Sequence, residues 1–296
     1  MWLFLGLASA FLLGTYDICK KISVQNNAVI PVLWGSIAIS SLLLLPFLII
    51  SRVEPSLLEN TIFFVPEIDL RTHFLIFLKS VIVLISWIFA YFALKNLPIT
   101  IVTPIRSTQP IWTVLGGVLI FGEQLSTLQI AGVAITLFSF FMFSVVGKKE
   151  GISFVHNKWI GFIILATLAG TCSALYDKYL MLQHNHMAVL TYYTLYQVGV
   201  MGAVLLLLWY PQRKKTTPFQ FRWSILLISL FLISADFIYF YALSMPDSLI
   251  SILSPIRRSG VIIPFLYGAI VMRDKNIKQK IWCLIGVLLG IVCLFL

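Results

Sequence analysis

Three arginines lie inside apolar stretches of the sequence shortly after a proline, and two of them follow it at the same spacing. Arg106 comes two residues after Pro104, and Arg257 and Arg258 follow Pro255. Arg106 is seven residues past Ile99, roughly 10 Å along a helix. Proline removes a backbone donor and tends to kink a helix. The pattern predicts guanidinium groups beside two broken helices, deep in an apolar environment.

A buried guanidinium group is suited to anion recognition. Its planar fork matches carboxylate or phosphate oxygens and stays charged at any working pH. Consecutive residues point about 100° apart on a helix, so Arg257 and Arg258 cannot both face one cavity. Because Arg257 aligns with Arg106, we expect these two to clamp the anion and Arg258 to pair with an acid on a neighbouring segment.

Four further ionisable residues lie in apolar stretches and offer an alternative, namely internal ion pairing. Asp236 lies among aromatic residues and is the candidate for a coupling proton or an ammonium contact, or for a salt bridge to Arg258 or Lys79. Asp17 and Asp177 lie near the ends of their segments, and Lys79 is a counterion or a second anion contact. Substrate contact and internal pairing both remain open.

Aromatic residues complete the set of candidate binding residues. Tyr239 is next to the acidic candidate Asp236, and Trp87 and Trp112 lie deep in apolar segments. Lining a cavity and plain packing both explain such tryptophans. The four histidines fall in loops or at segment ends, and the four cysteines lie in apolar runs. We therefore predict no metal site, no cofactor and no catalytic centre.

The composition identifies the environment of these charges. Hydrophobic residues make up 60% of the 296 residues and charged residues 11%, against about a quarter in soluble domains. The net charge of +10 would suggest nucleic acid in a soluble protein, but here the basic residues gather in short loops. The chain is expected to be an all-α integral membrane protein with no nucleic-acid partner.

Ten segments are long and apolar enough to cross a bilayer as helices, which takes about 20 residues. They are residues 2–24, 29–51, 74–94, 99–121, 127–147, 159–181, 187–210, 223–243, 248–271 and 279–296.

The two halves of the sequence resemble each other. Similar motifs recur in the same order, among them Tyr16-Asp17 and Tyr176-Asp177, Ala93-Leu94 and Ala242-Leu243, and the two proline–arginine motifs. We predict two five-helix repeats, 1–147 and 159–296, joined by a loop at 148–158. Five is odd, so the second repeat inserts upside down, an arrangement common in transporters. The expected cavity lies between spans 1, 3 and 4 and spans 6, 8 and 9.

Loop charge predicts the orientation in the membrane. One side holds Lys20, Lys21, Lys95, Lys148, Lys149, Lys158, Arg213, Lys214, Lys215, Arg222, Arg273, Lys275, Lys278 and Lys280, and the other side holds Arg52, Arg71 and Lys178. The positive-inside rule then places both termini outside the cytoplasm. We expect a bacterial inner membrane, and a monomer, because the duplication supplies the symmetry internally.

The arrangement resembles the EamA-type branch of the drug/metabolite transporter superfamily. Gly122-Glu123, with Leu125, Gln129 and Gly132, and the paired Ala-Leu…Pro motifs carry the resemblance. The second copy departs from it, since Arg273-Asp274 stands where Gly-Glu is expected. The resemblance implies a solute carrier without specifying the solute, and it favours cytoplasmic termini, against the loop charges.

These patterns predict a secondary transporter, exporting or exchanging a small anionic or zwitterionic metabolite by alternating access. Its expected partners are this substrate, membrane lipid and a coupling proton. No ATP-binding motif is present, so gradients must supply the work. One alternative is a flippase for a lipid-linked phosphate or amphiphile, which needs a lateral opening. A distant one is a membrane-embedded lipid-phosphate enzyme, disfavoured by the few intramembrane acids.

Overall fold

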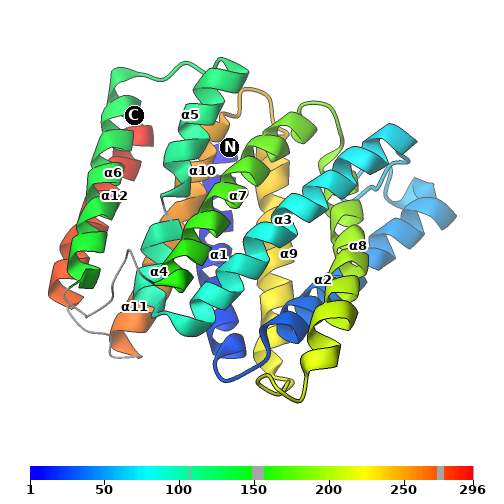
Figure 1. The fold of residues 1–296 in the computed structure, drawn as a ribbon. Helices are drawn as coiled ribbons and strands as arrows, with labels where there is room; N and C mark the ends of the chain where they lie inside the picture. Colours follow the sequence, from blue (N-terminus) through cyan, green and yellow to red (C-terminus); the bar gives the residue numbers. More distant parts are fainter. Residues whose placement is uncertain (107, 149–156, 272–276, 296) are drawn as a thin grey trace.

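The computed structural model describes residues 1–106, 108–148, 157–271 and 277–295, and these residues fold into helices without a strand. Eight longer helices and four pieces of broken helices run through the described part of the molecule (Figure 1). Their bounds are α1 Trp2–Val24, α2 Val29–Val53, α3 Leu70–Asn96, α4 Ile99–Arg106, α5 Gln109–Phe121, α6 Thr127–Lys148, α7 Lys158–Met181, α8 His186–Val204, α9 Trp223–Leu243, α10 Ile250–Arg258, α11 Ile262–Ile270 and α12 Ile277–Phe295. Short helical turns are η1 Pro55–Leu57, η2 Leu205–Trp209, η3 Tyr210–Gln212 and η4 Ser259–Val261.

Six described helices are long and apolar enough to cross a membrane. They are Trp2–Val24, Val29–Val53, Leu70–Asn96, Lys158–Met181, His186–Gln212 and Trp223–Leu243. The other four predicted spans coincide with α4 plus α5, α6, α10 plus α11, and α12. Ten spans in two repeats are compatible with this arrangement and remain a prediction. Most of the predicted connecting loop, and Arg273-Asp274, lie outside the described residues.

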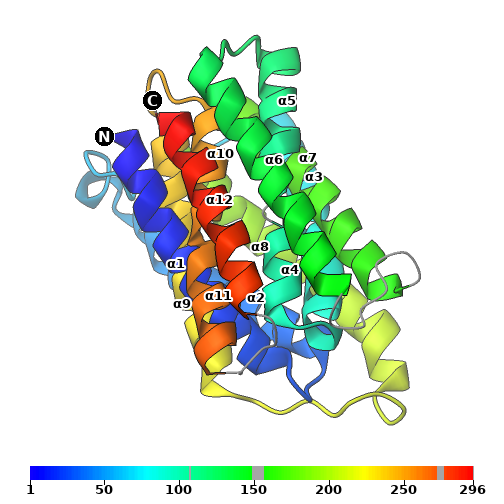
Figure 2. The same cartoon turned by 90° about the vertical axis from the view of Figure 1, so that its left-hand side faces the viewer.

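The helices pack in pairs that join the two halves of the chain. α1 runs along α9, α3 along α7, and α6 along α12, while α2 packs against α8. α6 and α12 form one flank of the molecule, and α2 and α8 lie at the opposite flank (Figures 1 and 2). The broken helices lie between these flanks, where α5 contacts α10 and α4 contacts α11.

Both predicted proline breaks are present. α4 ends at Arg106, and α5 starts at Gln109 with a proline in its first turn. In the second half, α10 contains Pro255 and gives way to η4 before α11 begins. A proline inside a helix removes a backbone hydrogen bond, which favours such interruptions. Each break therefore leaves arginine side chains at the end of a short helix in the interior.

Close backbone contact holds the second break against α1. A Cβ atom on Gly260 would lie 2.1 Å from the carbonyl oxygen of Ala10, and one on Gly14 would lie 2.4 Å from that of Gly260. Only glycine fits at such a distance. The break in the second half is therefore fixed directly on the first helix.

Glu123 has a structural role. The sequence did not suggest one, because the second half carries Arg273-Asp274 in place of the Gly-Glu motif to which Glu123 belongs. Its buried carboxylate accepts hydrogen bonds from the backbone N–H groups of Ile250 and Ser251, at 3.1 and 3.0 Å, and from the Ser251 hydroxyl. The first N–H groups of a helix lack intrahelical partners and favour negative charge. Glu123 thus caps α10 from the other half of the chain.

An N-cap also begins α3 at its exposed end. The Asp69 carboxylate accepts hydrogen bonds from the backbone N–H and the hydroxyl of Thr72. These bonds favour the ionised form and lower the pKa of the Asp69 carboxyl below its usual value.

Candidate functional site: a central charged cavity

A cavity of about 80 Å³ lies between the two halves of the chain. It is lined by Leu13, Tyr16 and Asp17 of α1; Lys79, Val83, Ser86 and Trp87 of α3; Arg106 of α4; Gln109 of α5; Gly170, Ser173, Ala174 and Asp177 of α7; Tyr193 of α8; Leu232, Asp236 and Phe240 of α9; and Arg257 and Arg258 of α10. The lining elements are those expected from the sequence, with α8 in addition. The space suits a compact group, since pockets for drug-sized ligands measure roughly 300–1,000 Å³.

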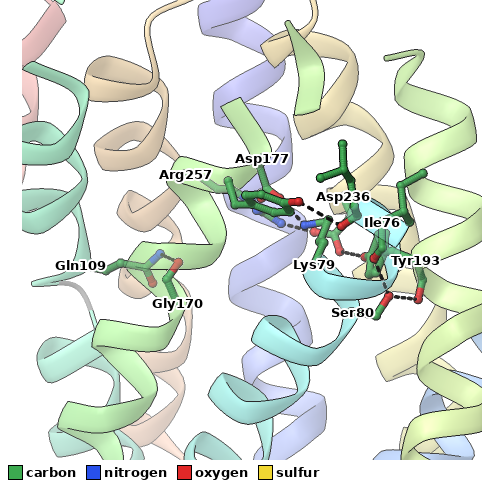
Figure 3. A network of polar contacts seen from close by, with 11 residues as sticks. Ile76, Lys79, Ser80, Gln109, Gly170, Asp177, Tyr193, Asp236 and Arg257 are labelled. Atoms are coloured by element: carbon green, nitrogen blue, oxygen red, sulfur yellow. Dashed lines mark hydrogen bonds and ion pairs between the residues drawn. The ribbon is translucent and has the colours of Figure 1, made fainter. Parts of the chain in front are cut away.

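Lys79 and Asp177 form a buried ion pair between α3 and α7 (Figure 3). Their side chains are 2% and 7% exposed, so water does not weaken the attraction. The Lys79 ammonium nitrogen also lies 4.8 Å from the ring centre of Tyr193 and 4.9 Å from that of Phe240. Lys79 is therefore a counterion of Asp177, one of the two roles that its position in the sequence left open.

Asp236 pairs with Arg257, which corrects the expectation for both residues. The Arg257 guanidinium donates to one carboxylate oxygen of Asp236, and the Tyr193 hydroxyl donates to the other at 2.7 Å. The guanidinium carbon of Arg257 lies 4.1 Å from the ring centre of Tyr239. The sequence left open a coupling proton, an ammonium contact or a salt bridge to Arg258 or Lys79 for Asp236. The side chain of Arg257 points towards α9, so the acid neutralises Arg257 instead.

Arg258 meets an amide rather than an acid. It donates a hydrogen bond to the side-chain oxygen of Gln109 at the start of α5. The Gln109 side-chain nitrogen donates to the carbonyl oxygen of Gly170 at 2.8 Å, which fixes the amide with its oxygen towards Arg258 (Figure 3). Arg258 was expected to leave the cavity and find an acid, but it lines the cavity together with Arg257. Both can do so because the helix ends at Arg258 and η4 follows.

Arg106 lines the cavity without a counterion. Across the described part of the chain, no carboxylate forms an ion pair with it, and its buried Nε has no hydrogen-bond partner. A buried polar group without a partner is costly and uncommon. Its presence in the cavity is a feature expected of a group that meets a ligand.

Asp17 is matched locally. It forms an ion pair with Lys20, one turn further along α1, and the Lys20 ammonium lies 4.3 Å from the ring centre of Tyr16. Asp17 also borders a small space shared with Arg106 and Arg258. Each of the three cavity acids therefore has its own cation.

The aromatic candidates separate into three situations. Trp87 lines the cavity. Tyr239 is buried behind it and faces Arg257. Trp112 is 48% exposed on α5 and is not among the residues that line the cavity, so of the two explanations left open for it, lining this cavity does not apply.

Sequence analysis missed several polar residues of the site, above all Gln109 and the ion-pair partner Lys20. Ser86, Ser173 and Tyr193 also line the cavity. An amide beside a helix break in an apolar run was an available signal for Gln109. In the described part of the chain, no group of three His, Cys, Asp or Glu side chains is placed to hold a metal ion.

Comparison with known proteins agrees with this architecture. Residues 1–145 match the model of the EamA-like transporter family, so the chain belongs to the EamA-type transporters of the drug/metabolite transporter superfamily through its first half. No curated protein matches the chain. One solved structure, titled only "Crystal structure of protein", aligns over 100% of this chain and 98% of its own, with a TM-score of 0.73 and 12% identity. That similarity shows a shared fold.

The family and the apolar helices together define an integral membrane protein of a transporter family. Its partners are accordingly a small-molecule substrate and the surrounding membrane.

Proposed function

We propose that the protein is a secondary transporter that moves a small anionic or zwitterionic metabolite by alternating access. The observation that carries the proposal is the presence of two arginines in the central cavity, Arg106 and Arg258, without carboxylate partners. This revises the expected clamp of Arg106 and Arg257, because Arg257 is neutralised by Asp236.

The helix contacts support the two-repeat arrangement. If the first five spans correspond in order to the last five, α1 corresponds to α7 and α3 corresponds to α9. The contact of α1 with α9 is then equivalent to the contact of α7 with α3. The contacts of α5 with α10 and of α4 with α11 likewise map onto cross-repeat contacts at the two breaks. Packing of this kind allows one repeat to rock against the other around a central site.

The same correspondence explains why Arg106 has no acid. Counting from the Ala-Leu motifs, Asp236 of the second half matches Trp87 of the first. Arg257 therefore meets a carboxylate, whereas the first-half residue that corresponds to this carboxylate, Trp87, carries an indole. The two halves have diverged at the point where a substrate anion would bind.

The test is ligand-dependent thermal stabilisation of detergent-purified protein, followed by uptake into proteoliposomes. A ligand at about 100 times its dissociation constant stabilises the fold by roughly 2.7 kcal/mol. We expect anionic or zwitterionic metabolites to stabilise the parent protein and to be taken up unchanged. Arg106→Gln and Arg258→Gln should abolish both effects, because each removes a cation that has no carboxylate partner among the described residues.

The matched control is Arg71→Gln, which removes an exposed arginine outside the cavity. It should bind and transport like the parent. Stabilisation by cations alone, or by anions with equal strength in all three variants, would show that the cavity arginines do not bind substrate.

A further inference from the structure

The charges around the cavity do not balance. Within the described residues, Lys20, Lys79, Arg106, Arg257 and Arg258 face or adjoin it as cations, against the three carboxylates of Asp17, Asp177 and Asp236. Each carboxylate is in an ion pair with one cation. Two guanidinium groups therefore remain without a negative partner, and both line the same space.

The surplus charges are concentrated on one side of the cavity. The paired groups Lys79, Asp177, Asp236 and Arg257 form one cluster with Tyr193, and Gln109 with Gly170 lies apart from it (Figure 3). Arg258 reaches Gln109. An adjoining small space is shared by Arg106, Arg258 and Asp17, whose charge is already taken by Lys20.

We propose that this side of the cavity binds a compact dianion, namely the phosphate group of a phosphate monoester or inorganic phosphate, between Arg106 and Arg258. The inference rests on the proposed transport function and specifies its substrate class. In surroundings of low dielectric constant, a monoanion leaves one guanidinium uncompensated and a zwitterion leaves both. A phosphate carries two charges on one small group whose oxygens can accept from two guanidinium forks.

Cavity size favours phosphate over a dicarboxylate. The free space is about 80 Å³, and a dicarboxylate places its two charges on separate groups at either end of a carbon chain. A phosphate group presents both charges at one point, which is where Arg106 and Arg258 border the same space.

Gln109 is the positioning residue of this site. Its amide holds Arg258 through a neutral oxygen, so the guanidinium keeps its net charge for the ligand. The bond from Gln109 to the Gly170 carbonyl sets the orientation of the amide, and a Cβ atom on residue 170 would lie 2.9 Å from the Gln109 oxygen. A carboxylate at residue 109 would instead neutralise Arg258 in place.

The experiment compares small probes of defined charge on purified protein at pH 8, read out as thermal stabilisation against concentration. The probes are methyl phosphate and inorganic phosphate as dianions, dimethyl phosphate as a monoanion of similar shape, and succinate as a dicarboxylate. A phosphate monoester is dianionic at this pH, since its second pKa is about 6. We expect methyl phosphate to act at a concentration at least tenfold below that of dimethyl phosphate or succinate. Its comparison with inorganic phosphate distinguishes an ester from the free ion.

The variant Gln109→Glu tests the charge count itself. The added carboxylate reduces the number of unpaired positive charges in the cavity from two to one. Dimethyl phosphate should then stabilise the protein at a concentration equal to or lower than that of methyl phosphate. The neutral variant Gln109→Met removes the amide without adding charge. In this variant methyl phosphate should still stabilise the protein at the lowest concentration of the probes. For each variant, the stabilisation by a probe is measured relative to the thermal stability of the same variant without probe.

Equal action of methyl phosphate and dimethyl phosphate in the parent would overturn the dianion while leaving an anion transporter in place. Stronger action of succinate would replace phosphate by a dicarboxylate. An unchanged order of preference in Gln109→Glu would show that Arg258 is not part of the site. No stabilisation by any anion would overturn the proposed function as well.

Discussion

At the scale of the residue, pairing distinguishes structural charges from those free to bind. Arg106 and Arg257 occupy matching places after a proline, yet Arg257 donates to Asp236 and Arg106 has no counterion in the described structure. Truncating one member of a buried pair leaves an uncompensated charge, whereas removing an unpaired charge relieves a cost. The two arginines should therefore differ in their effect on stability.

We predict that Arg257→Gln lowers the free energy of unfolding by about 3–5 kcal/mol, because it leaves Asp236 buried and unpaired. Arg106→Gln should leave stability unchanged or raise it. Chemical unfolding of both variants in the same detergent, without ligand, measures the difference. A large loss in Arg106→Gln would mean that this arginine has a structural partner.

The Lys79–Asp177 pair gives a second prediction at this scale. Asp177→Asn leaves the buried Lys79 charge alone and should cost about 3–5 kcal/mol of unfolding free energy. The double variant Lys79→Met with Asp177→Leu removes both charges and should recover most of that loss. A double-mutant cycle of unfolding free energies, with Lys79→Met and Asp177→Leu as its single variants, checks this. Additive losses would argue against direct coupling of the two residues.

At the scale of the element, the broken helices depend on contacts from the opposite half of the chain. Glu123 caps α10, and Gly260 brings η4 against the backbone of α1. Proline explains why the helices are interrupted. These contacts explain why the ends formed by the interruption stay where they are.

We predict that Gly260→Ala destabilises the fold by about 1–3 kcal/mol, since the added methyl group would meet the Ala10 carbonyl and force α1 and η4 apart. Gly161→Ala is the matched control, because no atom lies within 4 Å of its added Cβ. It should be neutral or stabilising by up to about 1 kcal/mol. Thermal unfolding of the two variants tests the contact. Equal behaviour of both would contradict close packing at η4.

At the scale of the whole molecule, the most extensive helix contacts are between helices of different halves of the chain. The pairs α1 with α9, α3 with α7 and α6 with α12 each combine one helix from either half. Two repeats packed in this way would supply the pseudo-symmetry within one chain, and the monomer stays a prediction.

Loop charge predicts that both termini lie outside the cytoplasm and that the loop holding Arg213, Lys214 and Lys215 lies inside. Alkaline phosphatase, which is active only outside, should therefore be active when fused to the C-terminus and inactive when fused after Lys215. Green fluorescent protein should give the opposite pattern. Cytoplasmic activity of the C-terminal fusion would reverse the orientation and place the termini as the family resemblance suggests.

The sequence alone determined the helical segments, the two proline breaks and the set of charges buried near them. These features depend on local composition, since the described residues of each predicted range are mostly helical and each proline removes a hydrogen bond within its own helix. The cavity position of Arg106 was predicted from its depth in its segment, whereas Asp177, which was placed near the end of its segment, also lines the cavity.

Only the tertiary structure decided which charges cancel. Choosing between Arg257 and Arg258 as the partner of Asp236 depends on how α10 is rotated against α9, and the hydrophobicity of α9, which is nearly even around that helix, does not encode this rotation. The rotation of α5 against its neighbours likewise decides that Trp112 is exposed and that Gln109 meets Arg258, and the sequence predicted neither. Pairing is a property of neighbouring helices, and it leaves Arg106 and Arg258 as the charges available to a substrate.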